Sequence, residues 1–239
     1  MTERMGETMV EAGTDRPRLA IALDVEDAES AFRLAGLVAP YFDVAKVGLE
    51  LYASVGPSIV TELIERGFQV FVDLKLHDIP TTVERASRAL GRLGATYATV
   101  HAAGGVDMVR AAIAGFHDGA AARGFSAPTV LGVTVLTSDT EAPVGLLAER
   151  VRTLQLAGAS ALVCAAPDLI EIRQLVPDFL TVVPGIRPAD TDTNDQARVA
   201  TPAAAVALGA NILVIGRAVS HAADPRGAAE QIAWSLGLV

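Results

Sequence analysis

A carboxylate and an ammonium group stand two residues apart at the end of an apolar run, Phe71-Val72-Asp73-Leu74-Lys75. If this run is a β-strand, Asp73 and Lys75 point to the same face, with Phe71, because side chains alternate along a strand. Removing two charges from water at the end of an apolar strand costs more than a purely structural ion pair returns. The pair therefore favours a catalytic role over a structural ion pair at the rim of the fold.

A second ammonium group lies in another apolar run, because Lys46 is the only charged residue among residues 44–47. Lysines are seldom buried without a partner. If the two runs are neighbouring strands, Asp73 can pair with Lys46 as well as with Lys75, so that each charge is balanced. The alternative is a lysine whose stem is buried while its ammonium group reaches water.

Short apolar runs rich in β-branched residues alternate with longer amphipathic segments along the whole chain. We predict strands at residues 19–23, 44–47, 70–73, 98–101, 129–135, 161–164, 180–183 and 212–215. We predict helices at residues 28–38, 58–66, 83–93, 106–122, 146–156, 168–175, 197–208 and 226–236. The strands start roughly 20 to 35 residues apart, which is typical of βα units with parallel strands.

Eight such units predict an α/β fold, a (β/α)8 TIM barrel that forms a single domain over residues 18–239. Residues 1–17 contain several charges and no apolar run, and we expect them to be a flexible tail. A doubly wound sheet is less favoured, because the first strand is followed by Asp24-Val25-Glu26 and not by a glycine-rich turn.

In a barrel of this kind the reaction site lies at the C-terminal ends of the strands, so the polar residues there are the candidates. Besides Lys46, Asp73 and Lys75, they are Asp24, Asp78, His101, Thr137 and Ser138. The last two strands run into Pro184-Gly185-Ile186-Arg187 and Gly216-Arg217. Glycine backbone and guanidinium groups there are suited to bind a phosphate. The polar segment 187–196 has the composition of a lid, with Arg187 and Gln196 at its ends reaching inward.

Several other residues have simpler interpretations. Thr81 and Glu84 form a T-x-x-E pattern that predicts a capping box at a helix start. Cys164 is interpreted as a small core residue, and none of the four histidines has the spacing of a zinc site. We therefore expect no metal.

Composition excludes several classes of function. The 28 acidic and 19 basic residues give a net charge of −9, which disfavours nucleic acids and anionic membranes as partners. Charged residues interrupt every apolar stretch before it reaches the length of a membrane span. A single cysteine cannot form an intramolecular disulfide, and we expect a cytoplasmic protein.

Four segments together carry a resemblance to a known family: Asp73-Leu74-Lys75-Leu76-His77-Asp78-Ile79-Pro80, Lys46-Val47-Gly48, Pro184-Gly185-Ile186-Arg187-Pro188 and Ile215-Gly216-Arg217. Taken in their order along the chain, these segments resemble the bacterial orotidine 5′-phosphate decarboxylases, and the resemblance covers residues 19–234. The resemblance implies decarboxylation of orotidine 5′-phosphate to UMP, the last step of de novo UMP synthesis, without a cofactor.

The resemblance also implies a role for each candidate residue. Lys75 is the proton donor, in a charged array with Lys46, Asp73 and Asp78. The substrate is bound at its ribose by Asp24 and Lys46, at its pyrimidine by Thr137, and at its phosphate by Arg187, Gln196, Gly216 and Arg217. In a homodimer, Asp78 and Thr82 enter the site from the second subunit.

Two other functions are compatible with these residues. The magnesium-dependent sugar-phosphate decarboxylases and synthases of the same superfamily share a D-x-K-x-x-D core, but their metal needs further acidic ligands, for which Glu50 is the only nearby candidate. A non-catalytic module that binds a phosphoribosyl group is the other alternative. A Schiff-base aldolase is disfavoured, because a lysine held protonated by Asp73 is a poor nucleophile.

Overall fold

The predicted apolar runs form the strands of a closed barrel. A computed structural model describes residues 16–136, 139, 143–188 and 199–239. Within them, parallel strands pair in the order β1 to β8, and β8 pairs with β1. The strands are β1 (Arg18–Ala22), β2 (Val44–Val47), β3 (Gln69–Leu76), β4 (Tyr97–His101), β5 (Thr129–Val133), β6 (Ala161–Val163), β7 (Leu180–Val183) and β8 (Ile212–Ile215). The predicted (β/α)8 barrel is confirmed.

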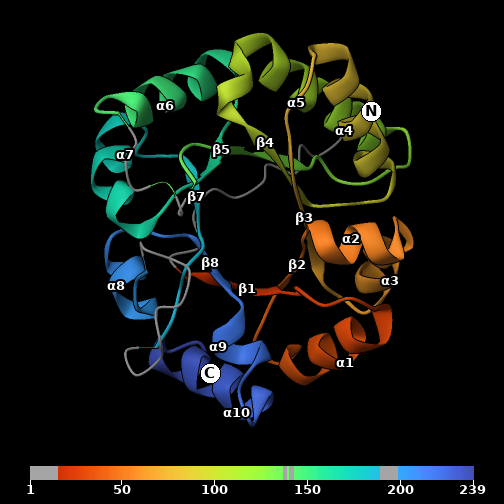
Figure 1. Cartoon of the computed structure of the whole chain (residues 1–239), viewed down its shortest axis with the longest axis vertical. Coiled ribbons are helices and arrows are strands. Elements are labelled where there is room, and N and C mark those ends of the chain that lie inside the picture. The colour runs from red at the N-terminus through yellow and green to blue at the C-terminus, as the bar shows by residue number, and fades with distance from the viewer. Residues whose placement is uncertain (1–15, 137–138, 140–142, 189–198) are drawn as a thin grey trace, which may run out of the picture.

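Helices surround the barrel on its outside, as Figure 1 shows. They are α1 (Ala28–Val38), α2 (Leu49–Val55), α3 (Ser58–Glu65), α4 (Pro80–Arg92), α5 (Gly105–Ala121), α6 (Leu146–Ala157), α7 (Leu169–Leu175), α8 (Pro202–Ala207), α9 (Arg217–Ser220) and α10 (Pro225–Ser235). Two 3-10 turns, η1 (Ala102–Gly104) and η2 (Ala166–Asp168), precede α5 and α7. None of the helices in the described ranges is long and apolar enough to cross a membrane.

Alternation along the strands creates two hydrophobic cores. On β1, Leu19 and Ile21 pack outward against the helices, while Ala20 and Ala22 face the barrel interior. The interior is filled by a second cluster: Ala20, Ala22, Val44, Phe71, Tyr97, Leu131, Ala161, Val182, Ile212 and Val214. The strands are thus buried on both faces, which is why they read as short continuous apolar runs.

Polar side chains close the N-terminal end of the barrel. Arg18 donates to the Tyr97 hydroxyl at 2.6 Å. Arg173 donates to the Thr181 hydroxyl at 2.8 Å and to the Asn211 side-chain oxygen at 2.9 Å. Because these groups satisfy one another, this end serves stability, and the opposite end is free to bind a ligand.

The element boundaries differ from the prediction in a few places. The strand β3 runs to Leu76 instead of ending at Asp73, whereas β5 ends at Val133 instead of at residue 135. The helix predicted at 197–208 is α8, which begins at Pro202, and residues 197–198 lie outside the described residues. The helices α2 and α9 were not predicted, because segments of seven and four residues are too short to show a helical period.

The predicted capping box is wrong. Pro80 occupies the first position of α4, so the N-cap is Ile79, and no side chain caps this end of the helix. Thr81 therefore lies inside the first turn. Glu84 pairs instead with Arg88, one turn further along the same helix.

At the start of the described chain, Arg16 donates a hydrogen bond to the backbone carbonyl of Leu238, just after α10. The predicted tail, residues 1–17, lies almost entirely outside the described residues. Its separation from the barrel domain stays a prediction.

Candidate active site

A cavity of about 550 Å³ opens at the C-terminal ends of the strands. Residues in or just after β1, β2, β3, β5, β6, β7 and β8 line it, including Ala22, Phe71, Val133, Val163, Val214 and the predicted polar residues described below. Its size lies within the range of sites for small molecules, roughly 300–1,000 Å³. We call it the mouth cavity.

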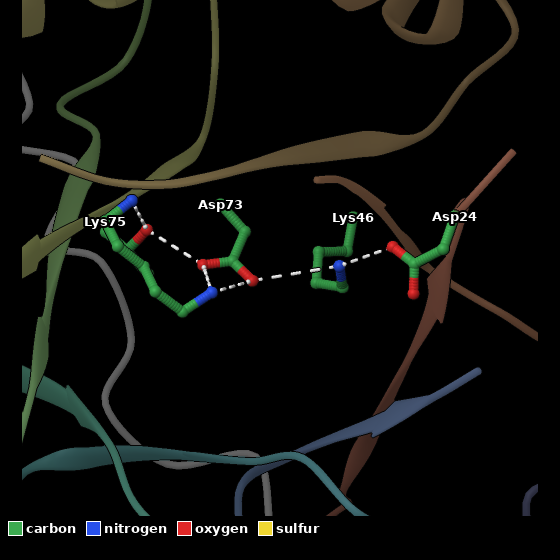
Figure 2. Close-up of polar contacts among 5 residues, drawn as sticks. Asp24, Lys46, Asp73 and Lys75 are labelled. Atoms are coloured by element: carbon green, nitrogen blue, oxygen red, sulfur yellow. Dashed lines mark hydrogen bonds and ion pairs between the residues drawn. The ribbon is translucent and has the colours of Figure 1, made fainter. Parts of the chain in front are cut away.

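Four charged side chains form a row across the wall of the mouth cavity (Figure 2). Lys46 Nζ lies 3.1 Å from Asp24 Oδ1 and 3.7 Å from Asp73 Oδ2. Lys75 Nζ donates to both oxygens of Asp73, at 2.9 and 3.0 Å. The signs alternate along the row, and the predicted pairing of Asp73 with both lysines is confirmed.

Burial differs along this row of charges. The side chains of Lys46 and Asp73 are 10% and 14% exposed, whereas those of Asp24 and Lys75 are 59% and 34% exposed. The two inner groups are therefore largely removed from water and depend on each other for charge balance. The more exposed Lys75 ammonium group faces the cavity and can reach a ligand.

Glycine keeps space free beside the row. A Cβ atom at Gly48 would lie 3.0 Å from Asp24 Oδ1 and 3.2 Å from Lys46 Nζ. Any larger residue would crowd this ion pair. The glycine of the Lys46-Val47-Gly48 segment is thus explained by the close approach of two charged side chains.

The loops after β7 and β8 bring the predicted phosphate-binding groups to the mouth cavity. Gly185, Arg187, Gly216 and Arg217 all line it. Gly185 has φ +75°, a conformation that favours glycine. Arg187 is 8% exposed, and its backbone N–H donates to the carbonyl of Ala200 at 3.0 Å. Arg187 follows β7, which lies opposite β3 in the closed barrel, whereas Gly216 and Arg217 follow β8, which pairs with β1 and so adjoins Asp24.

Asp78 and Thr82 lie outside the mouth cavity of their own chain. Both are exposed, and neither is among the described residues that line the cavity. Asp78 Oδ1 accepts a hydrogen bond from the backbone N–H of Ile79 at 2.7 Å, and Ile79 is itself 66% exposed. The row of charges in the structure therefore does not include Asp78 of the same chain.

Comparisons with known proteins agree with this geometry. A sequence model of the orotidine 5′-phosphate decarboxylase / HUMPS family matches residues 17–232. The chain belongs to this family. The orotidine 5′-phosphate decarboxylase of Thermobifida fusca is 46% identical over 232 residues, which are 91% of this chain and 95% of that protein. The enzyme of the same name from Lactiplantibacillus plantarum is 47% identical, over 87% of this chain and 93% of its own length.

A solved structure of this family has the same fold. The crystal structure of orotidine 5′-phosphate decarboxylase from Lactobacillus acidophilus matches with a TM-score of 0.77 and 33% identity, covering 92% of this chain and 99% of that chain. The relatives in the orotidine 5′-phosphate decarboxylase / HUMPS family therefore span nearly the same length as this chain.

Some predicted site residues cannot be placed. Thr137 and Gln196 lie outside the described residues, as does most of the segment 187–196 that we predicted to be a lid. Cys164 is buried, as predicted, and it also lines the mouth cavity.

The structure also adds residues that sequence reasoning missed. Leu49, Leu136, Ala218, Ser220 and His221 line the mouth cavity. Most of them follow a predicted strand end by a few residues, so a wider window after each strand would have found them. Thr99 was missed for another reason: it lies within β4, where its hydroxyl bonds to Asp73. Among the described residues, no group of three or more His, Cys, Asp or Glu side chains is placed to hold a metal ion.

His101, a predicted candidate at the end of β4, is not among the described residues that line the mouth cavity, but its environment predicts a pH-dependent stability. Its ring lies 5.5 Å from that of His77. Burial lowers the pKa of His101 below its ordinary value of 6.5, and the nearby cations His77, Lys75 and Arg150 lower that pKa further, while Asp73 opposes them. Below pH 6.5 the unfolded chain therefore binds a proton that the folded chain does not, so stability falls as the pH falls toward the folded pKa.

We expect the His101→Gln variant to lose less free energy of unfolding than the wild type when the pH is lowered from 7.5 to 5.5. Urea unfolding at several pH values measures this difference. His221→Gln, the same substitution at an exposed position, is the matched control for the loss of an imidazole. If the free energy of unfolding changed equally with pH in the wild type and in His101→Gln, the predicted contribution of His101 to this pH dependence would be wrong.

Proposed function

We propose that this chain decarboxylates orotidine 5′-phosphate to uridine 5′-phosphate, the last step of de novo UMP synthesis, with neither cofactor nor metal. One observation carries the proposal: in a chain of this family, Lys46, Asp73 and Lys75 alternate in charge on the wall of a cavity that is also lined by two arginines. The cytoplasm is the compartment that we propose for this activity.

The substrate spans the mouth cavity in this proposal. Arg187, Gly216 and Arg217 bind the phosphate, with Gln196 bridging the phosphate and the base. Asp24 and Lys46 bind the ribose hydroxyls, and Thr137 contacts the pyrimidine. This orientation brings C6 of the pyrimidine and its carboxylate to Asp73 and Lys75.

The chemistry follows from the two charges at C6. The Asp73 carboxylate repels the substrate carboxylate, whereas the Lys75 ammonium group stabilises the negative charge that develops on C6. The C6–carboxylate bond breaks, its electron pair stays on C6, and CO₂ leaves. A proton from Lys75 Nζ then binds to C6, and water returns a proton to Lys75.

A single charge contact does not supply the whole rate enhancement. At an effective dielectric of about 20, unit charges about 4 Å apart interact by about 4 kcal/mol, or roughly three powers of ten in rate. The remainder comes from exclusion of water and from phosphate-binding energy that is used at the distant reacting carbon. The two arginines of the cavity thus contribute to catalysis as well as to binding.

We further propose a homodimer in which Asp78 and Thr82 of each subunit complete the site of the other. Their exposure supports this arrangement, together with the exposed Ile79 between them. A partner subunit that covers this segment would bury an apolar side chain and deliver a carboxylate to the array.

The magnesium-dependent alternative is less well supported by the geometry. Glu50, its candidate ligand, is exposed on α2 and is not among the described residues that line the mouth cavity. Both oxygens of Asp73 already accept hydrogen bonds from the Lys75 ammonium group. A divalent cation at Asp73 would have to displace that group.

An absorbance assay tests the proposed function directly. We expect the protein to remove the orotate absorbance band of orotidine 5′-phosphate and to form UMP and CO₂ in equal amounts. The rate should be unchanged after extensive treatment with EDTA, because in this proposal lysine ammonium groups, and not a metal ion, balance the charge of the carboxylates. Activity that is lost with EDTA and restored by magnesium would move the chain to the sugar-phosphate branch. Binding without turnover would support the non-catalytic module.

A further inference from the structure

The pairing of β3 with β4 is irregular beside the reacting groups. Val72 pairs with Ala98, and the next matched pair is Leu76 with Val100. Three residues of β3, Asp73 to Lys75, therefore lie opposite a single residue of β4, which is Thr99. A regular ladder of backbone hydrogen bonds cannot form across such a bulge.

Lys75 has an unusual backbone conformation within this bulge. Its φ is +50°, and it is the only residue other than glycine with a positive φ in the described part of the chain. A side chain with a Cβ atom is disfavoured in this left-handed region. Such a conformation persists only where the surrounding structure holds it.

At the irregular pairing, the Thr99 side chain forms hydrogen bonds with Asp73 and Lys75 of β3. Thr99 Oγ1 accepts a hydrogen bond from the backbone N–H of Lys75 at 2.9 Å and donates one to Asp73 Oδ1 at 2.9 Å. Asp73 Oδ1 also accepts a hydrogen bond from Lys75 Nζ at 2.9 Å. One hydroxyl thus links the backbone of Lys75 to the carboxylate that binds the Lys75 ammonium group.

The Thr99 hydroxyl is well suited to hold this geometry. Thr99 is 1% exposed, so water cannot easily replace its hydroxyl. Since Thr99 donates to Asp73 and accepts from Lys75, its hydrogen-bond direction is set by two partners of fixed polarity. The β-branched side chain also has few rotamers on a strand, which restricts where the oxygen can lie.

We propose that Thr99 is a positioning residue for the decarboxylation. Its hydroxyl holds Lys75 in the left-handed backbone conformation and fixes the orientation of the Asp73 carboxylate, so that ammonium and carboxylate groups meet the reacting carbon at set positions. This inference rests on the proposed function, in which Lys75 and Asp73 act at C6. Because Thr99 lies on β4, which pairs with neither β7 nor β8, and the proposed phosphate-binding arginines follow those two strands, Thr99 should influence turnover more than affinity.

Three variants test the proposal. Thr99→Val replaces the hydroxyl with a methyl group of similar size, and Thr99→Ser keeps the hydroxyl. Thr134→Val is the matched control: Thr134 is also buried, but its hydroxyl donates to the carbonyl of Val163 and not to the charged row. All three are compared in kcat, in KM and in the affinity for UMP by calorimetry.

We expect kcat of Thr99→Val to fall roughly 10- to 100-fold, the effect of leaving a buried hydrogen-bonding group without its partner. Its KM and its affinity for UMP should change less than about threefold. Thr99→Ser and Thr134→Val should stay within about threefold of the wild type in kcat. A purely structural role of Thr99 would lower the stability of Thr99→Val without this selective loss of kcat.

The possible failures can be told apart. A wild type without turnover overturns the proposed function and the inference with it. An active wild type together with an unimpaired Thr99→Val overturns only the role of Thr99, and so does a Thr99→Ser variant as slow as Thr99→Val. If Thr99→Val does not fold, Thr99→Ala replaces it, and equal kcat values for Thr99→Ala and Thr99→Ser overturn the proposal.

Discussion

Lys75→Ala should reduce the turnover of orotidine 5′-phosphate by more than about three powers of ten. The substitution removes the proposed proton donor, which is also the ammonium group proposed to stabilise the C6 carbanion, and each effect alone is worth orders of magnitude in rate. It also leaves the Asp73 carboxylate without the partner that now binds both of its oxygens. The affinity for UMP should change much less, because the proposed phosphate-binding groups follow β7 and β8, which do not pair with β3.

Arg217→Ala is the comparison for Lys75→Ala, because it changes the proposed phosphate site and not the reacting carbon. Arg217 lines the phosphate side of the mouth cavity, so its loss should mainly raise KM, with a smaller decrease in kcat. Part of the decrease in kcat is expected, since remote binding energy can serve the transition state. Steady-state kinetics and UMP calorimetry separate the two variants. If Lys75→Ala kept near-normal kcat and showed only a raised KM, the proton-donor role would be wrong.

The sequence predicted the barrel because the strands are largely buried on both faces and the longer helices show their period, whereas α2 and α9 were too short to be predicted. It also predicted three members of the row of charges. Asp73 and Lys75 were placed on one face by simple alternation, and Lys46 was assigned to the same carboxylate as the available partner on a neighbouring strand. The structure confirms these contacts. The shorter contact of Lys46 with Asp24, at 3.1 Å, was not predicted. The local sequence pattern was sufficient to predict a contact wherever the regular alternation along a strand determines the direction of a side chain.

The irregular geometry could not be predicted. Nothing in the types of Asp73, Leu74 and Lys75 indicates that three residues will oppose one, or that Lys75 will have a positive φ. Those features depend on the pairing of β3 with β4, which is a property of the closed barrel. Thr99 was missed for the same reason, since a threonine inside a strand is usually only a good strand former.

Two sites are candidates for Asp78: the site of its own chain and the site of a second subunit. Asp78 follows Lys75 by three residues, and an extended chain covers roughly 10 Å in that length. It is exposed and does not line the cavity of its own chain. The exposed Ile79 beside it gives an apolar reason for another subunit to cover this segment.

Mixing two inactive variants should therefore restore activity. Lys75→Ala and Asp78→Asn proteins, each nearly inactive alone, are combined under conditions that exchange subunits. In a mixed dimer one site collects both substitutions, and the other has an intact Lys75 and an intact Asp78. With random pairing half of the dimers are mixed and one of their two sites is whole, which gives about a quarter of the wild-type activity.

A matched mixture shows whether such recovery comes from a shared site. Asp73 and Lys75 are in direct contact within one chain, so every site in a mixed dimer of Asp73→Asn and Lys75→Ala carries one of the two substitutions, and no activity should return. Subunit exchange is measured independently with two affinity tags. If exchange occurs and the Lys75→Ala and Asp78→Asn mixture still shows no recovery, Asp78 serves the site of its own subunit. The homodimer would then be unnecessary for a complete charged array.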